Sequence, residues 1–172
     1  MKLSVCMNTQ GVIGKDLDLM YSFKSDLVRF KKLTSEGEDP HIVMGRITYD
    51  SIGKPLPNRT NIVISRKPNL TIEGCKVMTL EDFITEYKDH PNMWLIGGGQ
   101  IYRELLPHVK EAYITHVSDT QQYGDEYVNI YDVKDKIFKE FDVVDSSMWH
   151  EEEDRITKNK HMICFLDYAR RN

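Results

Sequence analysis

The feature that most constrains the fold of this chain is a regular alternation of short apolar segments with helical patterns. Apolar runs of strand length lie at residues 2–7, 41–44, 61–65, 75–78, 93–96 and 112–117. Helical patterns lie between them, at residues 25–33, 45–52, 80–87 and 100–106. Strands that alternate with helices favour a parallel sheet with helices on its faces.

The pattern changes near the end of the chain, where no further helix is predicted after residue 117. Residues 138–149 and 160–168 read as two long strands joined by a charged turn, and we interpret the acidic run 151–154 as solvated. A terminal strand pair favours an antiparallel edge, so the sheet is predicted to be mixed. We expect an α/β fold with about eight strands, mostly parallel, and about four flanking helices. The length of 172 residues, without a repeat or long linker, suits a single domain over residues 1–172.

Composition argues against several classes of protein. The net charge of −4 disfavours a general affinity for nucleic acid or an anionic membrane, and no segment approaches the length of a membrane span. Three cysteines without a close pair give neither a disulfide framework nor a zinc pattern, and the six histidines are scattered singly, so no metal is expected. The N-terminus lacks a signal-type apolar region, and a reducing cytosol is the simplest setting. We expect a cytoplasmic protein that is a monomer, because no long apolar stripe suggests assembly.

Two predicted strands end in glycine turns that each open a helix. One turn contains Gly45, Arg46 and Thr48, and the other is 97–99, with three glycines. Backbone N–H groups and a helix N-terminus converge at such a turn, which favours a phosphate. Neither turn is a complete nucleotide-binding motif, because Tyr102 stands where the last glycine of G-x-G-x-x-G would be, and helix–sheet packing is the alternative. Two such turns in one small domain match the two halves of a diphosphate.

A third strand end adds positive charge. Ser65, Arg66 and Lys67 lie at the end of the strand 61–65, where two cations and a hydroxyl would hold a 2′-phosphate and select NADP over NAD. Arg46 could join them. An exposed basic loop is the alternative interpretation of this segment.

One carboxylate lies within an otherwise apolar segment, LMYSFKSDLVRF, at residues 19–30. On a helix, Asp26 falls on the same face as Phe23, Leu27 and Phe30. An acid in the first helical turn is common, because the macrodipole favours it. If Asp26 is instead partly buried, desolvation raises its pKa, and the carboxylate can bind an amidine-like donor edge through two parallel hydrogen bonds. Both interpretations stay open on this segment alone.

Taken together, these segments resemble the dihydrofolate reductase family. The matching stretches are GVIGKDLDL, SDLVRFKK, IVMGRITYDSIGKPLPNRTNIVIS, LIGGGQIY and AYITHV, and their order and spacing fit as well. The resemblance is dense from Gly11 to Tyr102 and thins after Val117. It implies the family's reaction, in which a hydride passes from C4 of NADPH to C6 of dihydrofolate and a proton reaches N5. It also implies binding of antifolate inhibitors such as methotrexate or trimethoprim.

The resemblance implies roles in catalysis for three residues. Asp26 would hydrogen-bond the N3 and 2-amino edge of the pterin and favour protonation at N5 through water. Thr115 would support that carboxylate, and an ordinary strand threonine is the alternative. Tyr21 stands where the family usually has a tryptophan that holds an ordered water, and it would substitute through its aromatic body and polar tip.

Binding residues follow from the same resemblance, position by position. Apolar packing on the substrate would come from Leu27, Phe30 and Ile52, and Arg59 would pair with the carboxylate of the glutamate tail. The full set implied for the substrate is Val5, Cys6, Asp26, Leu27, Phe30, Lys31, Ser51, Ile52, Arg59, Ile96, Tyr102 and Thr115. The set implied for NADPH is Cys6, Met7, Ile13, Gly14, Leu19, Gly45, Arg46, Ile47, Thr48, Ser65, Arg66, Lys67, Ile96, Gly97, Gly98, Gly99, Gln100, Ile101 and Tyr102. The family also has a cis peptide at the position of Gly97–Gly98.

Several positions depart from the family pattern. Residues 15–19 would form the mobile lid, but residues 20–21 are Met-Tyr in place of the usual Pro-Trp. Ser4 replaces a residue that is commonly apolar, and Val-Asn at residues 128–129 replaces Phe-Pro. Asp125 is kept and would brace the lid. These changes bear on rate and lid motion more than on the class of reaction.

Two alternative functions stay open. A reductase acting on a riboflavin precursor has the same fold, but that group lacks the helix acid and the PLPNR arginine together, and this chain has both. A folate- or nucleotide-binding protein without catalysis is favoured only by the Met-Tyr pair at residues 20–21.

Overall fold

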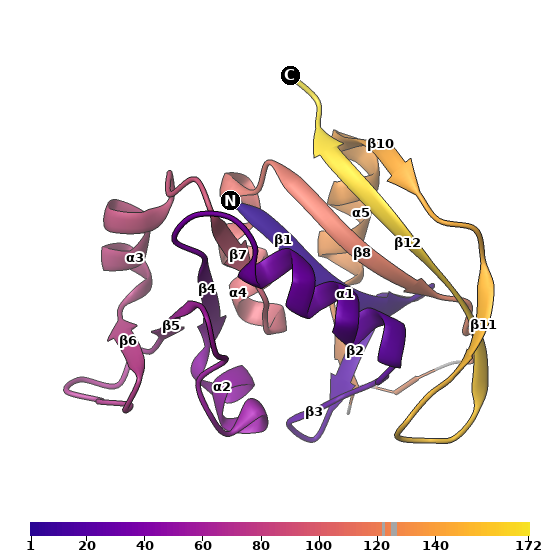
Figure 1. Ribbon diagram of the computed structural model, residues 1–172, viewed down its shortest axis with the longest axis horizontal. Coiled ribbons are helices and arrows are strands. Elements are labelled where there is room, and N and C mark those ends of the chain that lie inside the picture. Colours follow the sequence, from indigo (N-terminus) through magenta and orange to yellow (C-terminus); the bar gives the residue numbers. More distant parts are fainter. Residues whose placement is uncertain (122, 125–126) are drawn as a thin grey trace.

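The computed structural model describes residues 1–121, 123–124 and 127–172 of the chain. Its main sheet has the order β10-β12-β8-β1-β7-β4-β5-β6, and β11 pairs with β12 beside this path. Strands from β8 to β6 pair in parallel, whereas β10, β11 and β12 pair antiparallel. The bounds are β1 (Lys2–Asn8), β4 (His41–Gly45), β5 (Thr60–Ile64), β6 (Cys75–Met78), β7 (Met93–Leu95), β8 (Glu111–Val117), β10 (Phe141–Ser146), β11 (His150–Glu153) and β12 (Lys160–Arg170). The predicted mixed sheet with an antiparallel C-terminal edge is confirmed (Figure 1).

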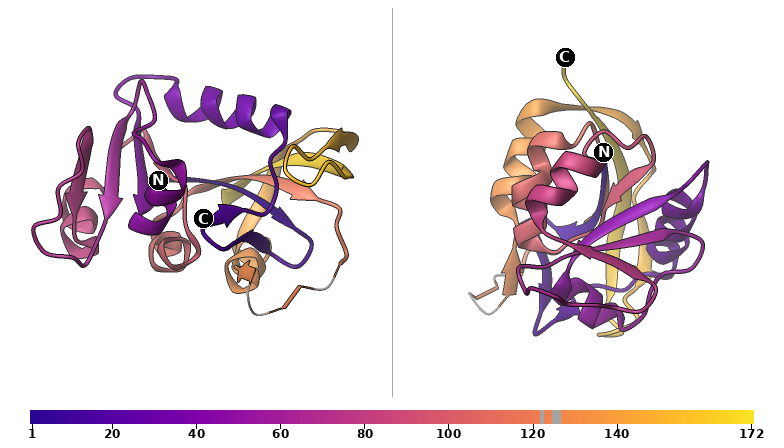
Figure 2. Two further views of the ribbon diagram at one scale, coloured as in Figure 1. Left: turned by 90° about the horizontal axis from the view of Figure 1, so that it is seen from below. Right: turned by 90° about the vertical axis from the view of Figure 1, so that its left-hand side faces the viewer.

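Helices cover both faces of this sheet (Figure 2). On one face lie α1 (Lys24–Ser35) and α2 (Arg46–Ile52), and on the other lie α3 (Leu80–Tyr87), α4 (Gly99–Leu105) and α5 (Tyr131–Glu140). A short 3-10 turn, Leu106–His108, continues α4. Among the described residues, no helix combines the length and apolar character that crossing a membrane requires.

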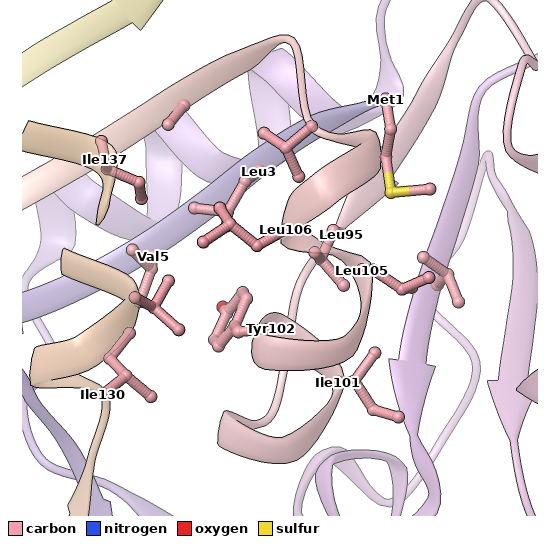
Figure 3. Packing of buried hydrophobic residues seen from close by; sticks show 14 of the residues in the cluster. Met1, Leu3, Val5, Leu95, Ile101, Tyr102, Leu105, Leu106, Ile130 and Ile137 are labelled. Carbon is pink, nitrogen blue, oxygen red and sulfur yellow. The ribbon is translucent and has the colours of Figure 1, made fainter. Parts of the chain in front are cut away.

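Alternating side chains of the strands form the two cores. In β4, Val43 packs toward α3, α4 and α5, whereas Ile42 and Met44 pack toward α1 and α2. All three side chains are fully buried, as expected for a central parallel strand covered on both faces. Figure 3 shows Tyr102 of α4 near Leu3 and Val5 of β1, so this helix packs directly against β1.

Two sequence predictions are wrong in the C-terminal part of the chain. Helices do not stop after residue 117, because α5 follows and ends only at Glu140, inside the predicted strand 138–149. Its apolar residues Val133 and Ile137, spaced by one helical turn, are each 1% exposed. The acidic run 151–154 is not a solvated turn, because its first three residues belong to β11 and Asp154 is fully buried.

Residues 8–23, which include the predicted lid, contain short strands of their own. These are β2 (Val12–Lys15) and β3 (Asp18–Leu19), which form a small sheet with β9 (Tyr127–Asn129) in the order β3-β2-β9. This small sheet holds the predicted lid beside the main sheet. The turn between β2 and β3 has positive φ at Asp16 (49°) and Leu17 (70°).

Candidate active site

A cavity of about 1320 Å³ runs between α1, α2 and α4 along the ends of the central strands. In open α/β sheets, ligands bind at the carboxyl ends of the strands, and the cavity lies there. Of all the predicted site residues, only Met7, Lys31, Arg59 and Thr115 are outside its lining. Its wall also includes side chains without a predicted role, among them Tyr49, Leu56, Leu70, Ile72, Leu80 and Val128.

Asp26 points from the first turn of α1 toward β8. The hydroxyl of Thr115, a residue 1% exposed, donates to Asp26 Oδ1 over 2.5 Å. Burial raises the pKa of the Asp26 carboxyl, and the nearby Glu152 charge adds to this, while the Thr115 hydrogen bond and Arg29 oppose it. The net shift is upward, so this acid holds its proton closer to neutral pH than an ordinary aspartate.

The walls beside Asp26 are mainly neutral. Tyr102 donates its hydroxyl to the Ser4 backbone carbonyl over 2.8 Å, and burial raises the pKa of that hydroxyl. Burial also raises the pKa of the Cys6 thiol well above its usual value, and the Asp26 charge adds to the shift. Cys6 is therefore a neutral packing residue and not a nucleophile. Tyr102 and Cys6 both hold their protons, so among these three groups Asp26 is the one suited to exchange a proton.

The hydroxyl of Tyr21 is held by the segment that follows β8. Tyr21 donates to Asp119 Oδ2 over 2.8 Å, and Tyr123 donates to the same oxygen over 2.5 Å. The Tyr21 ring is 4% exposed and stacks on Phe23, with ring centroids 5.9 Å apart. Tyr21 thus ties the end of the predicted lid to Asp119, an arrangement that the sequence did not suggest.

Two carboxylates that the sequence analysis missed hold the chain on either side of Phe23. Asp154 Oδ1 accepts the N–H of Ser22 over 2.8 Å, and Glu152 Oε1 accepts the N–H of Ser25 over 3.0 Å. Phe23 is the N-cap residue of α1 and offers no side-chain cap. The first N–H groups of a helix need acceptors, and an apolar N-cap residue cannot supply one. This was the sequence signal that a side chain from elsewhere in the chain must do so.

The two glycine turns lie against each other at the ends of β4 and β7. The N–H of Gly45 donates to the carbonyl of Gly97 over 2.7 Å. A Cβ at Gly98 would lie 3.1 Å from Thr48 Oγ1, and one at Gly45 would lie 3.0 Å from Ile101 Cγ1. Gly97 has φ +119°, and the Gly97–Gly98 peptide is cis, as the family resemblance implied. The lack of side chains at Gly45 and Gly98 therefore lets the two turns pack closely together beside the cavity that both line.

Cationic side chains lie along the same edge of the cavity. Arg66 and Lys67 are exposed beyond β5, and the Lys67 N–H donates to Ser65 Oγ over 3.1 Å. Arg46, at the start of α2, forms an ion pair with Asp50 one turn later. Hydroxyl, guanidinium and ammonium donors at one edge are the chemistry that phosphate groups require.

Arg59 lies outside the cavity lining but close to it. Its Nη1 donates to Thr34 Oγ1 over 2.6 Å, and its Nε donates to the Pro57 carbonyl over 3.0 Å. The guanidinium lies 5.9 Å from the centre of the Phe30 ring, which lines the cavity. These contacts fix Arg59 while using only two of its five N–H donors.

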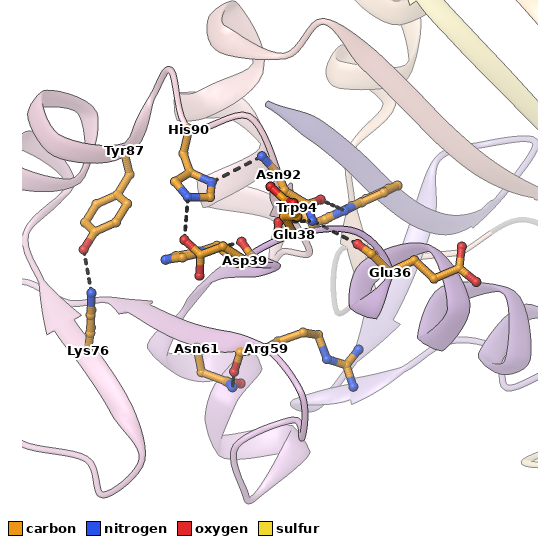
Figure 4. Close-up of polar contacts among 11 residues, drawn as sticks. Glu36, Glu38, Asp39, Arg59, Asn61, Lys76, Tyr87, His90, Asn92 and Trp94 are labelled. Atoms are coloured by element: carbon orange, nitrogen blue, oxygen red, sulfur yellow. Dashed lines mark hydrogen bonds and ion pairs between the residues drawn. The ribbon is translucent and has the colours of Figure 1, made fainter.

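One group of metal-ligating side chains lies away from the cavity. Asp39, His41 and His90 offer atoms within 4.8 Å of one another. His90 Nε2 is 3.3 Å from Asp39 Oδ2, and its Nδ1 accepts the N–H of Asn92 over 3.2 Å (Figure 4). His41 Nδ1 donates to the Asp39 carbonyl over 2.9 Å. These hydrogen bonds account for the cluster, which joins the chain before β4 to the chain before β7.

The predicted lid lines the cavity through Leu17 and Leu19, which are 63% and 55% exposed. Val128 of β9 also lines the cavity, and it pairs in register with Gly14 of β2. Asp125, which would brace the lid, lies outside the described residues. The lid's supports that can be described are therefore β9 and the Tyr21 contact with Asp119.

Comparisons with known proteins agree with this geometry. The family model described as dihydrofolate reductase matches residues 1–170. A dihydrofolate reductase of Bacillus subtilis is 35% identical over 171 residues, covering 96% of this chain and 92% of that protein, and one of Mycobacterium leprae is 41% identical over 125 residues, covering 70% and 74%. The structure of dihydrofolate reductase from Enterococcus faecalis, complexed with NADP(H) and RAB-propyl, superimposes with a TM-score of 0.78 at 26% identity, over 99% of this chain and 96% of that one.

Proposed function

Because the chain belongs to the dihydrofolate reductase family, we infer that it is a dihydrofolate reductase, which reduces 7,8-dihydrofolate to 5,6,7,8-tetrahydrofolate with NADPH. The observation that carries the chemistry is the Asp26 carboxyl, which lines the cavity and is bonded to Thr115. The reaction belongs to folate metabolism.

We propose that the glycine turns and the cations beside them hold NADPH. The diphosphate would lie beside the two turns, since Gly45, Thr48 and Gly98 all line the cavity. Ser65, Arg66 and Lys67 would take the 2′-phosphate, which separates NADPH from NADH. When bound, the cofactor supplies the hydride that C6 of the pterin receives.

Asp26 would bind the pterin and manage its proton. Its carboxyl would face N3 and the 2-amino group, a flat donor edge that two oxygens fit. Because burial raises the pKa of Asp26, more of this carboxyl is protonated at a given pH than in an exposed aspartate, which favours protonation of N5. Thr115 would keep one oxygen of the carboxyl in place, as its hydrogen bond to Oδ1 supports.

Tyr21 would act by position, through its ring and its bond to Asp119. The ring borders the cavity, and the bond fixes the end of the lid. In this way Tyr21 would help to hold water in place beside Asp26, the role that the family resemblance gives to the tryptophan at this position. The pair at residues 20–21 thus supplies little support for a protein without catalysis.

The rest of the substrate would lie toward α2. Leu27, Phe30 and Ile52 provide apolar cavity walls for its two ring systems. Arg59 would pair with the carboxylate of the glutamate tail through the donors that its bonds to Thr34 and Pro57 leave over. Lys31 would be a weaker contact for that tail.

Three wider proposals follow from family membership. The whole chain would be one domain that works as a monomer in the cytoplasm. Antifolates with an amidine-like edge, such as methotrexate or trimethoprim, would bind at Asp26 in place of the substrate. Size-exclusion chromatography tests whether the protein is a monomer, and inhibitor titration tests whether antifolates bind.

The assay that tests the function follows the loss of NADPH absorbance with dihydrofolate as the second substrate. We expect turnover that depends on both compounds and that antifolates abolish. A riboflavin precursor in place of dihydrofolate serves as the control substrate. Turnover of that precursor alone, or tight antifolate binding without any NADPH oxidation, would contradict the proposed function.

A further inference from the structure

The N-terminal end of α1 lies beside the hairpin of β11 and β12 (Figure 1). Glu152 of β11 accepts the Ser25 N–H over 3.0 Å and also accepts the Ser25 hydroxyl. Ser25 directly precedes Asp26 in the first turn of the helix. A carboxylate that is 127 residues away in sequence therefore supplies the cap that Phe23 lacks.

The acids of β11 divide between two faces of the strand. The Glu152 side chain is 19% exposed and turns toward α1, whereas the Glu151 side chain is 56% exposed and pairs with Lys160. Although burial raises the pKa of Glu152, hydrogen bonds from Ser25 hold it below its ordinary value. These contacts thus favour the negatively charged form of Glu152 relative to that of an exposed glutamate.

Several groups face Asp26 from the elements packed around it. Arg29, on the same helix, lowers the pKa of Asp26, and Glu152 raises it. Thr115 donates from β8, and the neutral groups Tyr102 and Cys6 lie on α4 and β1. Asp154 also acts on Cys6, and His150 Nε2 is 3.5 Å from Glu152 Oε2. Arg29 is in turn engaged with Asp167. After burial, Glu152 is the group that opposes the attraction of Arg29.

We propose that Glu152 is a positioning residue for the reaction, since its carboxylate fixes the turn that carries Asp26 and its charge favours the protonated form of that acid. This inference rests on the proposed role of Asp26 in dihydrofolate reduction.

Glu152→Gln separates the charge from the hydrogen bonds. The amide oxygen can still accept the Ser25 N–H, and the amide N–H can donate to the Ser25 hydroxyl. We expect the pH profile of turnover to move toward lower pH, with roughly threefold lower turnover above the midpoint, because one like charge near Asp26 is lost. Glu151→Gln removes the same charge from the other face of β11 and should leave the profile unchanged.

Glu152→Asp provides the complementary test, because it keeps the charge and shortens the reach to Ser25. We expect its midpoint to stay near that of the unaltered protein, while its thermal stability falls. It also covers the case in which Glu152→Gln folds poorly. An active Glu152→Gln protein with an unshifted profile would overturn the proposal and leave the enzyme's function intact. Lack of activity in the unaltered protein would contradict the function itself.

Discussion

The two ends of the cavity are built in different ways. At the cofactor end, short segments that each run from a strand through glycine into a helix bring Gly45 and Gly97 within hydrogen-bond distance, 2.7 Å. At the acid end, Asp26 is placed by Thr115, Glu152 and Asp154, all of them about 90 residues or more away in sequence. The glycine turns are thus positioned by local backbone geometry, whereas Asp26 is positioned by side-chain contacts between distant segments.

This difference teaches which changes each end tolerates. A glycine turn fails when a side chain fills it, since the ligand needs the backbone itself. The acid end fails when a charge or hydrogen-bond acceptor is lost, even far from the helix that carries Asp26. The predictions below test each end in turn.

The largest effect is expected at Asp26. Asp26→Asn keeps an oxygen that can accept the Thr115 hydroxyl but removes the proton that the acid exchanges. We expect turnover at neutral pH to fall roughly 10²- to 10⁴-fold, the usual contribution of an acid–base group. Steady-state NADPH oxidation measures this, and NADPH binding, followed by fluorescence, should stay normal. Near-normal turnover would remove Asp26 from the mechanism.

The cofactor end is broken most directly at Gly97. Its φ of +119° is unfavourable for any other residue, and a Cβ would lie 3.3 Å from the Tyr102 ring. Gly97→Ala should cost about 1–3 kcal/mol of stability and weaken NADPH binding about tenfold or more. Gly53→Ala is the control, because Gly53 has φ +77° with nothing within 4 Å of an added Cβ. Equal loss of NADPH affinity in both variants would refute the proposed contact.

The support behind the acid end is tested at Asp154. Its carboxylate accepts hydrogen bonds from the N–H groups of Ser22 and Thr157 and from the Thr157 hydroxyl. Asp154→Asn cannot accept all of these, so we expect a loss of about 1–3 kcal/mol in the free energy of unfolding. Urea unfolding measures it, with exposed Glu153→Gln as the control. No loss of stability would show that Asp154 is dispensable.

The contribution of Asp154 to the free energy of unfolding is expected to depend on pH. Burial raises the pKa of Asp154, but hydrogen bonds from Thr157 and Ser22 bring it below the ordinary value. A depressed pKa means that this residue stabilises the fold above the pKa of the unfolded state and stops doing so as pH falls through its folded value. The difference between Asp154→Asn and the unaltered protein should therefore shrink in acid.

A smaller effect is expected from the cations beyond β5. Arg66→Gln removes one charge-assisted contact from the proposed 2′-phosphate site, so the KM for NADPH should rise about tenfold. The KM for NADH, which has no 2′-phosphate, should not change. Lys88→Gln, remote from the cavity lining, is the control for net charge. An equal change for both cofactors would show that Arg66 does not read this phosphate.

The smallest effect concerns stability at Asp26. Because burial raises the pKa of Asp26, this residue stabilises the fold at low pH, and the contribution is lost as pH rises through its folded pKa. Asp26→Asn should thus raise Tm at neutral pH by about 2 °C, and the gain should vanish in acid. A lower Tm at neutral pH would contradict this sign.

The sequence predicted the position of the glycine turns better than the surroundings of Asp26, for a physical reason. Strand–glycine–helix turns are local patterns, so Gly45 and Gly97 could be placed from the chain alone. Helix α5 was missed although Val133 and Ile137 have helical spacing. The predicted strand 138–149 included the last residues of this helix. Glu152 and Asp154 read as solvated acids, since their partners Ser25 and Ser22 become neighbours only in the folded chain. Family resemblance, and not spacing, singled out Thr115.

The central claim is that contacts between distant segments make Asp26 an acid unlike its exposed counterparts. A titration of its carboxyl in the unliganded protein, by infrared or carbon-13 difference against Asp26→Asn, tests this directly. We expect a midpoint clearly above that of an ordinary aspartate, since burial and Glu152 outweigh Arg29 and the Thr115 hydrogen bond. A midpoint at or below the ordinary value would contradict the account.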